Sequence, residues 1–301
     1  MATPQLRTAF LALIFLLALT STAMTAPLAV SVSIPPQKWL SDRIGGQHVI
    51  TTVLVARGQD PHTFEPTPRQ IAAISRSKIY FTIGMEFEQQ ITQRLDAAIA
   101  GLALIDTTTA ISRIAIGEHG QESGTGQGDR HHDGVDPHVW LSPGNLIKMA
   151  EIMATAMSNT DPDHAADYRD NLDQTVATLQ QLHHELSLEL APFKGASFYV
   201  FHPSFGYFAK EYGLHQEAVE ISGKSPTPKQ LSALIAKARG DQVRIIFVQP
   251  QFDSRSATAV ARAIDGVVAP LDALAEDVAA NLRIMAAEIT KALSHHDQAR
   301  P

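Results

Sequence analysis

The longest periodic segment of the chain is DHAADYRDNLDQTVATLQQLHHELSLEL, residues 163–190. Its apolar residues recur at intervals of three and four positions, the spacing of one face of an α-helix; they are Leu172, Val176, Leu179, Leu182, Leu186 and Leu190. A helix of about 28 residues is about 40 Å long at about 1.5 Å per residue. Such a helix can bridge two domains as a stiff rod, and the sequence on either side of it agrees with this division.

Both flanks of the predicted helix alternate between strand-like and helix-like segments. Apolar and β-branched segments typical of strands cover residues 28–34, 49–55, 78–84 and 102–107 before it, and 196–201, 217–220, 243–248 and 266–270 after it. Helices are expected to start at Thr67, where proline takes the first helical position, and near Pro203, Thr227, Ser254 and Ala273. This alternation indicates βαβ units with parallel sheets, an α/β fold.

The composition is that of a globular protein of 301 residues, with 45% hydrophobic and 18% charged residues. That length suits two domains. The net charge of −7 argues against nucleic acid and anionic membrane surfaces as partners. The chain has no cysteine, so it forms no disulfide, carries no lipid on an N-terminal cysteine and has no thiol nucleophile.

The N-terminal residues 1–26 are typical of a secretory signal peptide. Arg7 precedes the apolar run Ala9–Leu19, which is too short to cross a bilayer at about 20 residues. Ser21 and Ala23 favour cleavage after Ala23, although an uncleaved anchor is the alternative. We therefore expect a periplasmic monomer that does not insert into the membrane once the signal is removed.

Two short stretches repeat one pattern: DPHTFEP begins at Asp60 and DPHVWLSP at Asp136. In each, a proline restricts the backbone directly before a histidine. A third histidine follows the predicted strand 196–201, and an aspartate follows 266–270. Because ligands of open α/β sheets bind beyond the carboxyl ends of strands, we expect one site formed by His62, His138, His202 and Asp272.

Three imidazoles and one carboxylate form a ligand set suited to Zn²⁺, whereas Mn²⁺ prefers more oxygen ligands. Each residue also has an ordinary interpretation: a histidine at a strand end can be a surface or hydrogen-bonded residue, and Asp272 can cap a helix. A second group lies in the Gly-rich segment 117–135, which contains His119, His131 and His132. This segment either gathers zinc loosely or is a solvated loop without a role.

Five segments occur in an order that resembles a known family: SVSIPPQKWLSDRIGG, DPHTFEPTPRQI, DPHVWLSP, FHPSFGYFAKEYGL and LDALAED. Together they resemble the periplasmic metal-binding receptors of ABC-type zinc and manganese importers, over essentially the whole mature chain. The resemblance implies two α/β lobes joined by one long rigid helix, with the metal site in the cleft between the lobes. The implied division is residues 27–162 for the first lobe, 163–192 for the linking helix and 193–301 for the second.

The resemblance also implies the metal ligands. His62 lies in the PHxF segment, His138 in DPHxW and His202 in the FH segment, while Asp272 lies near the fourth, acidic ligand of the family. Manganese receptors of this family tend to carry glutamate at the third place, so His202 favours zinc. The sparse histidine segment is similar to the histidine-rich loop of the zinc branch.

These observations predict a non-catalytic receptor that captures Zn²⁺ and delivers it to an ABC permease in the inner membrane. The motifs HExxH, GxSxG and GxxxxGK[ST] are missing from the sequence. The alternatives are a manganese or iron receptor of the same transporter class, a secreted zinc-dependent hydrolase with Glu65 as its base, and an adhesin-like surface protein related to the cell-adhesion members that the family resemblance includes.

Overall fold

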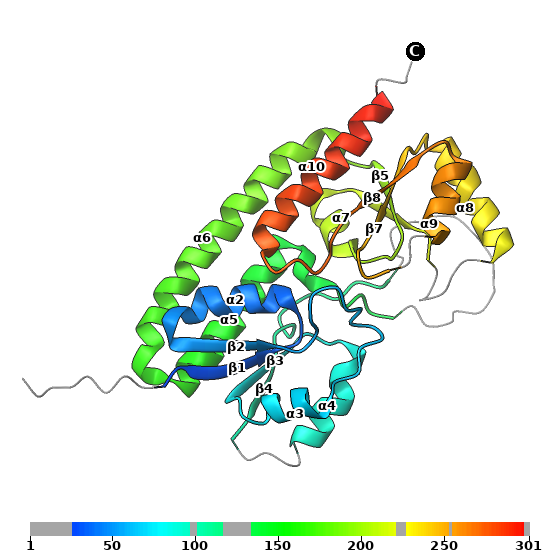
Figure 1. The fold of residues 1–301 in the computed structure, drawn as a ribbon. Coiled ribbons are helices and arrows are strands. Elements are labelled where there is room, and N and C mark those ends of the chain that lie inside the picture. The colour runs from blue at the N-terminus through cyan, green and yellow to red at the C-terminus, as the bar shows by residue number, and fades with distance from the viewer. Residues whose placement is uncertain (1–25, 97–100, 117–133, 221–226, 253–254, 298–301) are drawn as a thin grey trace, which may run out of the picture.

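The computed structural model describes residues 26–96, 101–116, 134–220, 227–252 and 255–297. These residues form two α/β lobes, the lower and the upper half of Figure 1. The predicted fold class, two α/β lobes with parallel sheets and one long helix, is confirmed. The expected signal segment, apart from its last residue, and the histidines at positions 119, 131 and 132 lie outside the described residues.

Each lobe contains one parallel four-stranded sheet. In the N-terminal lobe the order is β2-β1-β3-β4, with β1 at Leu28–Val32, β2 at Val49–Val53, β3 at Ile79–Thr82 and β4 at Ala103–Asp106. In the C-terminal lobe the order is β6-β5-β7-β8, with β5 at Ser197–Val200, β6 at His215–Ala218, β7 at Ile245–Val248 and β8 at Val267–Pro270. The two sheets therefore share one topology: the second strand of the lobe at one edge, followed by the first, third and fourth.

Helices follow most strands and cover the sheets. They are α2 Pro35–Gly45, α3 Pro68–Ile74, α4 Glu86–Asp96 and α5 Pro143–Thr160 in the first half, and α7 Gly206–Tyr212, α8 Pro228–Gly240, α9 Arg255–Ala263 and α10 Val278–Asp297 in the second, with short 3₁₀ turns at Gly46–His48, Val139–Leu141, Pro162–His164 and Ala191–Phe193. None of the helices in the described part of the chain combines the length and apolarity needed to cross a membrane.

Helices α3 and α8 begin with the same N-terminal capping box. The hydroxyl of Thr67 accepts the N–H of Gln70, and the Gln70 side chain accepts the N–H of Thr67 at 2.9 Å. Thr227 and Gln230 repeat this capping box at the start of α8. The segments TPRQ and TPKQ thus begin the helix that follows the second strand of each lobe, a repeat that the sequence analysis overlooked.

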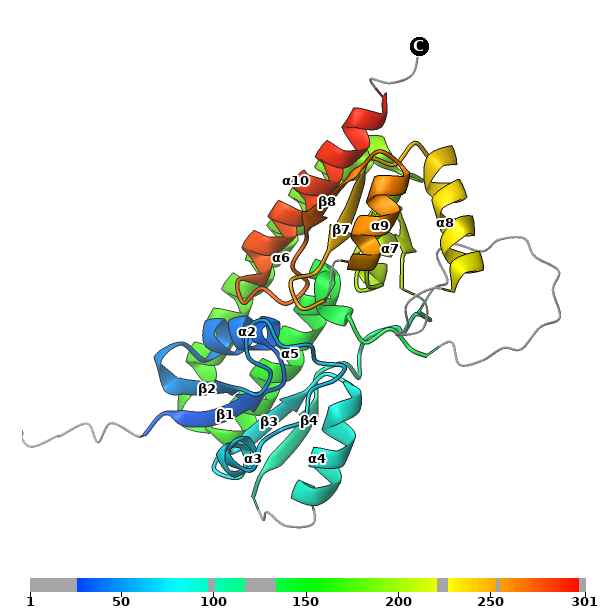
Figure 2. The same ribbon diagram turned by 45° about the vertical axis from the view of Figure 1, so that its right-hand side comes forward.

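Helix α6, Ala165–Leu190, is the predicted rod and runs along both lobes in Figures 1 and 2. Its buried face consists of Tyr168, Thr175, Leu179, Leu182, Leu186 and Leu190. α2 and α5 of the N-terminal lobe and α10 of the C-terminal lobe pack against it. One helix therefore contributes to the apolar core of both halves. The lobe boundaries at residues 162 and 192 stay a prediction.

Two expectations about helices need correction, and one helix was missed. The helix expected near Pro203 begins at Gly206, because residues 202–204 form a turn in which the Ser204 N–H donates to the His202 carbonyl at 2.8 Å. The helix expected near Ala273 begins at Val278, where the Asp277 carboxylate accepts the N–H of Ala280 at 3.0 Å and so caps the helix. Helix α4 was not predicted.

The crevice between β1 and β3, where the strand order of the N-terminal lobe reverses, is filled by the protein's own side chains. The buried Glu88 carboxylate accepts the Ser33 hydroxyl and the N–H groups of Ile83, Gly84 and Met85, at 2.9, 2.7 and 2.9 Å. Burial raises the pKa of Glu88 to about 7, although these hydrogen bonds act to lower it. Ligands of such sheets usually bind at this crevice. Because Glu88 already occupies it, a ligand of this protein has to bind elsewhere, and the space between the lobes is available.

We expect Leu182→Ala in α6 to lower the free energy of unfolding by about 2–5 kcal/mol, because it leaves a cavity at a fully buried position of the helix that both lobes share. Urea unfolding followed by circular dichroism measures this change. Leu188→Ala is the matched control, since Leu188 lies on the same helix with 65% of its surface exposed; it should shift stability by less than about 0.5 kcal/mol. Equal losses in both variants would contradict the shared-core role of α6.

Candidate metal centre

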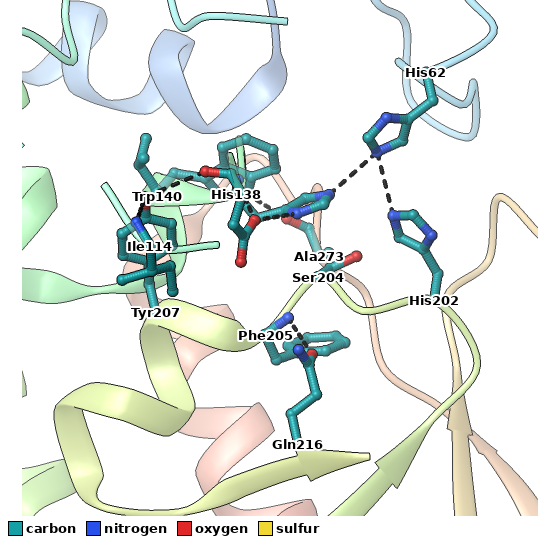
Figure 3. A network of polar contacts seen from close by, with 12 residues as sticks. His62, Ile114, His138, Trp140, His202, Ser204, Phe205, Tyr207, Gln216 and Ala273 are labelled. Atoms are coloured by element: carbon teal, nitrogen blue, oxygen red, sulfur yellow. Dashed lines mark hydrogen bonds and ion pairs between the residues drawn. The ribbon is translucent and has the colours of Figure 1, made fainter. Parts of the chain in front are cut away.

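Three histidine side chains from distant parts of the chain meet between the lobes. The Nε2 atom of His62 lies 3.2 Å from the Nε2 atom of His138 and 3.2 Å from that of His202. The three ligand atoms all lie within 4.8 Å of one another. Figure 3 shows the three rings pointing toward one another, with His62 reaching in from the loop between β2 and α3.

The two DPH stretches place their histidines by the same turn. The Asp60 carboxylate accepts the backbone N–H of His62 at 2.9 Å, and the Asp136 carboxylate accepts that of His138 at 2.9 Å. An aspartate that accepts the N–H two residues later forms an Asx turn. The aspartates in the repeated pattern are therefore turn formers, a signal that was present in the two quoted stretches.

Carboxylates behind two of the rings decide which nitrogen faces the centre. The Nδ1 atom of His138 lies 2.7 Å from an oxygen of Asp136, and the Nδ1 atom of His202 lies 2.9 Å from an oxygen of Glu220. A carboxylate only accepts, so Nδ1 carries the proton in both rings and the lone pair of Nε2 points toward the centre. The sequence analysis did not identify Asp136 or Glu220 as part of the site.

His202 is also held by the loop after β7. Gln249 brackets its backbone, accepting the His202 N–H at 3.3 Å and donating to the His202 carbonyl at 2.6 Å. The Phe252 ring stacks on the His202 imidazole with centroids 4.6 Å apart and planes at 22°. Because β5 and β7 are neighbours in the sheet, this arrangement lies at the crevice where the strand order of the C-terminal lobe reverses.

Burial keeps the rings in the form that binds metals. His138 is 3% exposed and His202 is 8% exposed, while His62 is half-buried. Removal from water lowers the pKa of His62, and the nearby His202 lowers it further. Burial also lowers the pKa of His202, although the hydrogen bond to Glu220 acts in the opposite direction. Both rings are therefore neutral near pH 7, with lone pairs free for a cation.

Two of the three nitrogen pairs have the spacing that one small cation requires. With bonds of about 2.05 Å, two nitrogens 3.2 Å apart subtend an angle of about 100° at a common ion, near the tetrahedral value that Zn²⁺ prefers. The cavity beside the rings has a volume of about 10 Å³, close to that of one water-sized body. It is lined by Pro61, His62, His138, Trp140, His202, Ser204, Gln249, Gln251, Phe252, Ala273 and Leu274.

Asp272, the fourth ligand expected from the sequence, does not join this group. Its Oδ1 atom accepts the Gln251 side-chain amide at 3.2 Å and the Leu274 N–H at 2.9 Å. The next residue, Ala273, connects the lobes through its backbone: its carbonyl accepts the indole N–H of Trp140 at 2.6 Å. The structure thus brings three of the four predicted residues together, and a role of Asp272 as a ligand stays a prediction.

The backbone of Gly206 lies directly beside the Asp136 carboxylate, which orients His138. A Cβ atom at this position would lie 2.6 Å from the Oδ2 atom of Asp136 and 3.2 Å from a methyl group of Ile114. Only glycine leaves room for the buried Asp136 side chain in its present place. The glycine of the quoted segment FHPSFGYF therefore has a steric reason that belongs to the site.

The sequence matches the family described as "Zinc-uptake complex component A periplasmic" over residues 30–291. The chain belongs to this family. A "Putative metal-binding protein" of Chlamydia muridarum is 30% identical over 254 residues, which cover 84% of this chain and 87% of that protein. The family is one of metal-binding transport receptors, and it is not a family of enzymes.

Two solved structures are similar to most of this chain. "Crystal structure of ZnuA" has a TM-score of 0.80 and 36% identity, covering 88% of this chain and 99% of the other. "Crystal structure of 138-173 ZnuA deletion mutant plus zinc bound" has a TM-score of 0.79 and 37% identity, covering 88% and 98%. The likeness of the two-lobed fold to ZnuA therefore extends over nearly all of the described residues.

We expect Gly206→Ala to weaken metal binding about tenfold or more, because the new methyl group displaces Asp136 and with it the His138 ring. Isothermal titration with Zn²⁺ measures the change. Gly240→Ala is the matched control, since a Cβ there meets nothing within 4 Å. An unchanged affinity in Gly206→Ala, with a folded protein, would show that the position of Asp136 does not matter for binding.

Proposed function

We propose that this protein captures Zn²⁺ in the periplasm and hands it to an ABC importer in the inner membrane. The observation that carries the proposal is the convergence of the His62, His138 and His202 Nε2 atoms between the lobes, where His138 and His202 are buried. His138 and His202 place Nδ1 on a carboxylate, so each directs the lone pair of Nε2 toward His62. A cation that accepts all three lone pairs satisfies the arrangement.

The ligand atoms favour zinc over manganese or iron. The group consists of three nitrogens, and the carboxylates of Asp136 and Glu220 contact the far side of the His138 and His202 rings. Nitrogen ligands in tetrahedral geometry suit Zn²⁺, whereas Mn²⁺ prefers oxygen. The two carboxylates together carry the charge that balances a dication. The zinc-bound structure of the related ZnuA variant supports the same choice of metal.

The space at the site supports a receptor better than a hydrolase. A cavity of about 10 Å³ accommodates an ion, and a peptide or ester substrate needs far more room. Glu65, the base that a hydrolase would need, lines a different groove, formed with Phe64, Pro66, Ile71, Phe87, Gln90 and Ile91. The membership of the chain in a family of transport receptors agrees with this preference.

Transfer to a permease and export with removal of residues 1–26 are parts of the same proposal. The family is described as periplasmic, and a receptor in that compartment needs an import partner in the membrane. A site shared by two lobes offers a way to release the ion, because separating His62 of one lobe from His202 of the other removes a ligand. We propose that the protein acts as a monomer.

We expect His202→Ala to weaken zinc binding by more than tenfold, which is more than about 1.4 kcal/mol, because the variant lacks one of three ligands. Competition of Zn²⁺ with a chelating dye measures the affinity, and the same assay with Mn²⁺ tests the choice of metal. His215→Ala is the control, since His215 is exposed at the start of β6. A loss below tenfold would place His202 outside the coordination set, and tighter binding of Mn²⁺ would favour the manganese alternative.

The affinity for zinc should fall as the pH is lowered. Protons compete with the metal only where the rings titrate, and burial lowers the pKa of His62 and His202 below the ordinary value of 6.5. We expect a nearly constant affinity from pH 8 to about 6.5 and a steepening loss toward pH 5 as the imidazoles take up protons. Titrations in metal-free buffers at several pH values measure this, and a flat profile down to pH 5 would contradict a histidine site.

A further inference from the structure

Asp272 forms the third of three similar turns around the cleft. Its Oδ1 atom accepts the N–H of Leu274 at 2.9 Å, just as Asp60 accepts that of His62 and Asp136 that of His138. In the two DPH turns the residue two positions later is a histidine of the site, and in the third it is a leucine. The shared turn explains why Asp272 lies at the cleft without its carboxylate joining the imidazoles.

One contact distinguishes the third turn. The side-chain amide of Gln251 donates to the same Oδ1 atom of Asp272 at 3.2 Å. Gln251 itself lines the ion cavity, together with Ala273 and Leu274. The carboxylate that we expected at the fourth coordination position is thus bonded to an amide at the wall of that cavity.

Gln251 is held in place by the residues around it in the chain. Gln249, two positions earlier, is bonded to the backbone of His202, and Phe252, one position later, stacks on the His202 ring. The side chain of Gln251 therefore starts from a backbone that is fixed relative to the third imidazole. The same four-residue segment that positions His202 also holds Asp272.

We propose that Gln251 sets the strength of zinc binding by holding the Asp272 carboxylate out of the coordination set. A carboxylate that turned Oδ1 toward the ion would supply a fourth ligand and would have to give up the Gln251 hydrogen bond, because Oδ1 is the atom that Gln251 holds. The amide therefore competes with the metal for Asp272 and keeps the site at three protein ligands, which favours release of the cargo. This inference rests on the proposed function, because it concerns the affinity of the same site.

A double-mutant cycle tests the proposal on the full mature protein. The variants are Gln251→Ala, Asp272→Asn and the two combined, with zinc affinity from chelator competition as the readout. Asparagine keeps the oxygen that accepts the Leu274 N–H, and so the turn, while it removes the anionic ligand. Gln181→Ala is the matched control, since Gln181 also donates to an acid, Glu185, at 3.1 Å on the exposed side of α6.

Gln251→Ala should tighten zinc binding about three- to tenfold, the change that corresponds to one net hydrogen bond, and should have no effect in the Asp272→Asn background. The absorption spectrum of the Co²⁺-substituted protein should change in Gln251→Ala, because an oxygen ligand is gained, and should stay as in the parent when Asp272 is asparagine. A change in thermal stability alone would not produce this pattern.

An unchanged or weaker affinity in Gln251→Ala, or tightening that persists with asparagine at position 272, would overturn the role of Gln251. These outcomes differ from a failure of the proposed function, in which the parent protein itself would not bind zinc. The His202→Ala variant, measured in the same titration, shows whether the three-imidazole site is the one being observed.

Discussion

The site depends on one electrostatic constraint: three imidazole nitrogens lie within 4.8 Å of one another between the lobes, and two of the rings are buried. Lone pairs that face one another at 3.2 Å repel unless a proton or a cation lies between them. Asp136 and Glu220 accept hydrogen bonds from Nδ1 of His138 and His202, and these two rings therefore direct the lone pairs of Nε2 inward. The two carboxylates also supply negative charge one ring away from the centre, so a dication is balanced without direct contact with an acid.

The two lobes have the same sheet topology but use the crevice of the sheet differently. Each sheet has the strand order second, first, third, fourth, and each therefore has a crevice where the order reverses. The C-terminal lobe uses its crevice for His202 and Gln249. The N-terminal lobe fills its own with Glu88, whose carboxylate takes up three backbone N–H groups. The first lobe therefore contributes a loop histidine, His62, and the ion site lies between the lobes.

The lobes are joined through packing more than through charge. The Lys38–Glu276 pair connects them at 2.9 Å but is solvent-exposed, and such pairs contribute about 0–1 kcal/mol. The buried face of α6 and the bond from Trp140 to the Ala273 carbonyl are shielded from water. The shared helix fixes the position of the two lobes relative to each other. The ionic contacts across the cleft are weak, so they add little to the free energy that holds the cleft closed.

The sequence alone determined the elements and the candidate histidines, because these are encoded by neighbouring residues. Apolar spacing predicted α6, and the DPH pattern singled out His62 and His138. Apolar and β-branched segments predicted the eight strands of the described residues, although β6 begins at His215, two residues before the expected segment 217–220. Only the tertiary structure decided the rest of the site. Glu220 lies 18 positions from His202, and Gln251 lies 21 positions from Asp272, so no local pattern records either hydrogen bond. Asp272 illustrates the reason: a carboxylate after a strand can be a metal ligand or a turn former, and its hydrogen bonds to Gln251 and Leu274 come from partners that the fold brings to it.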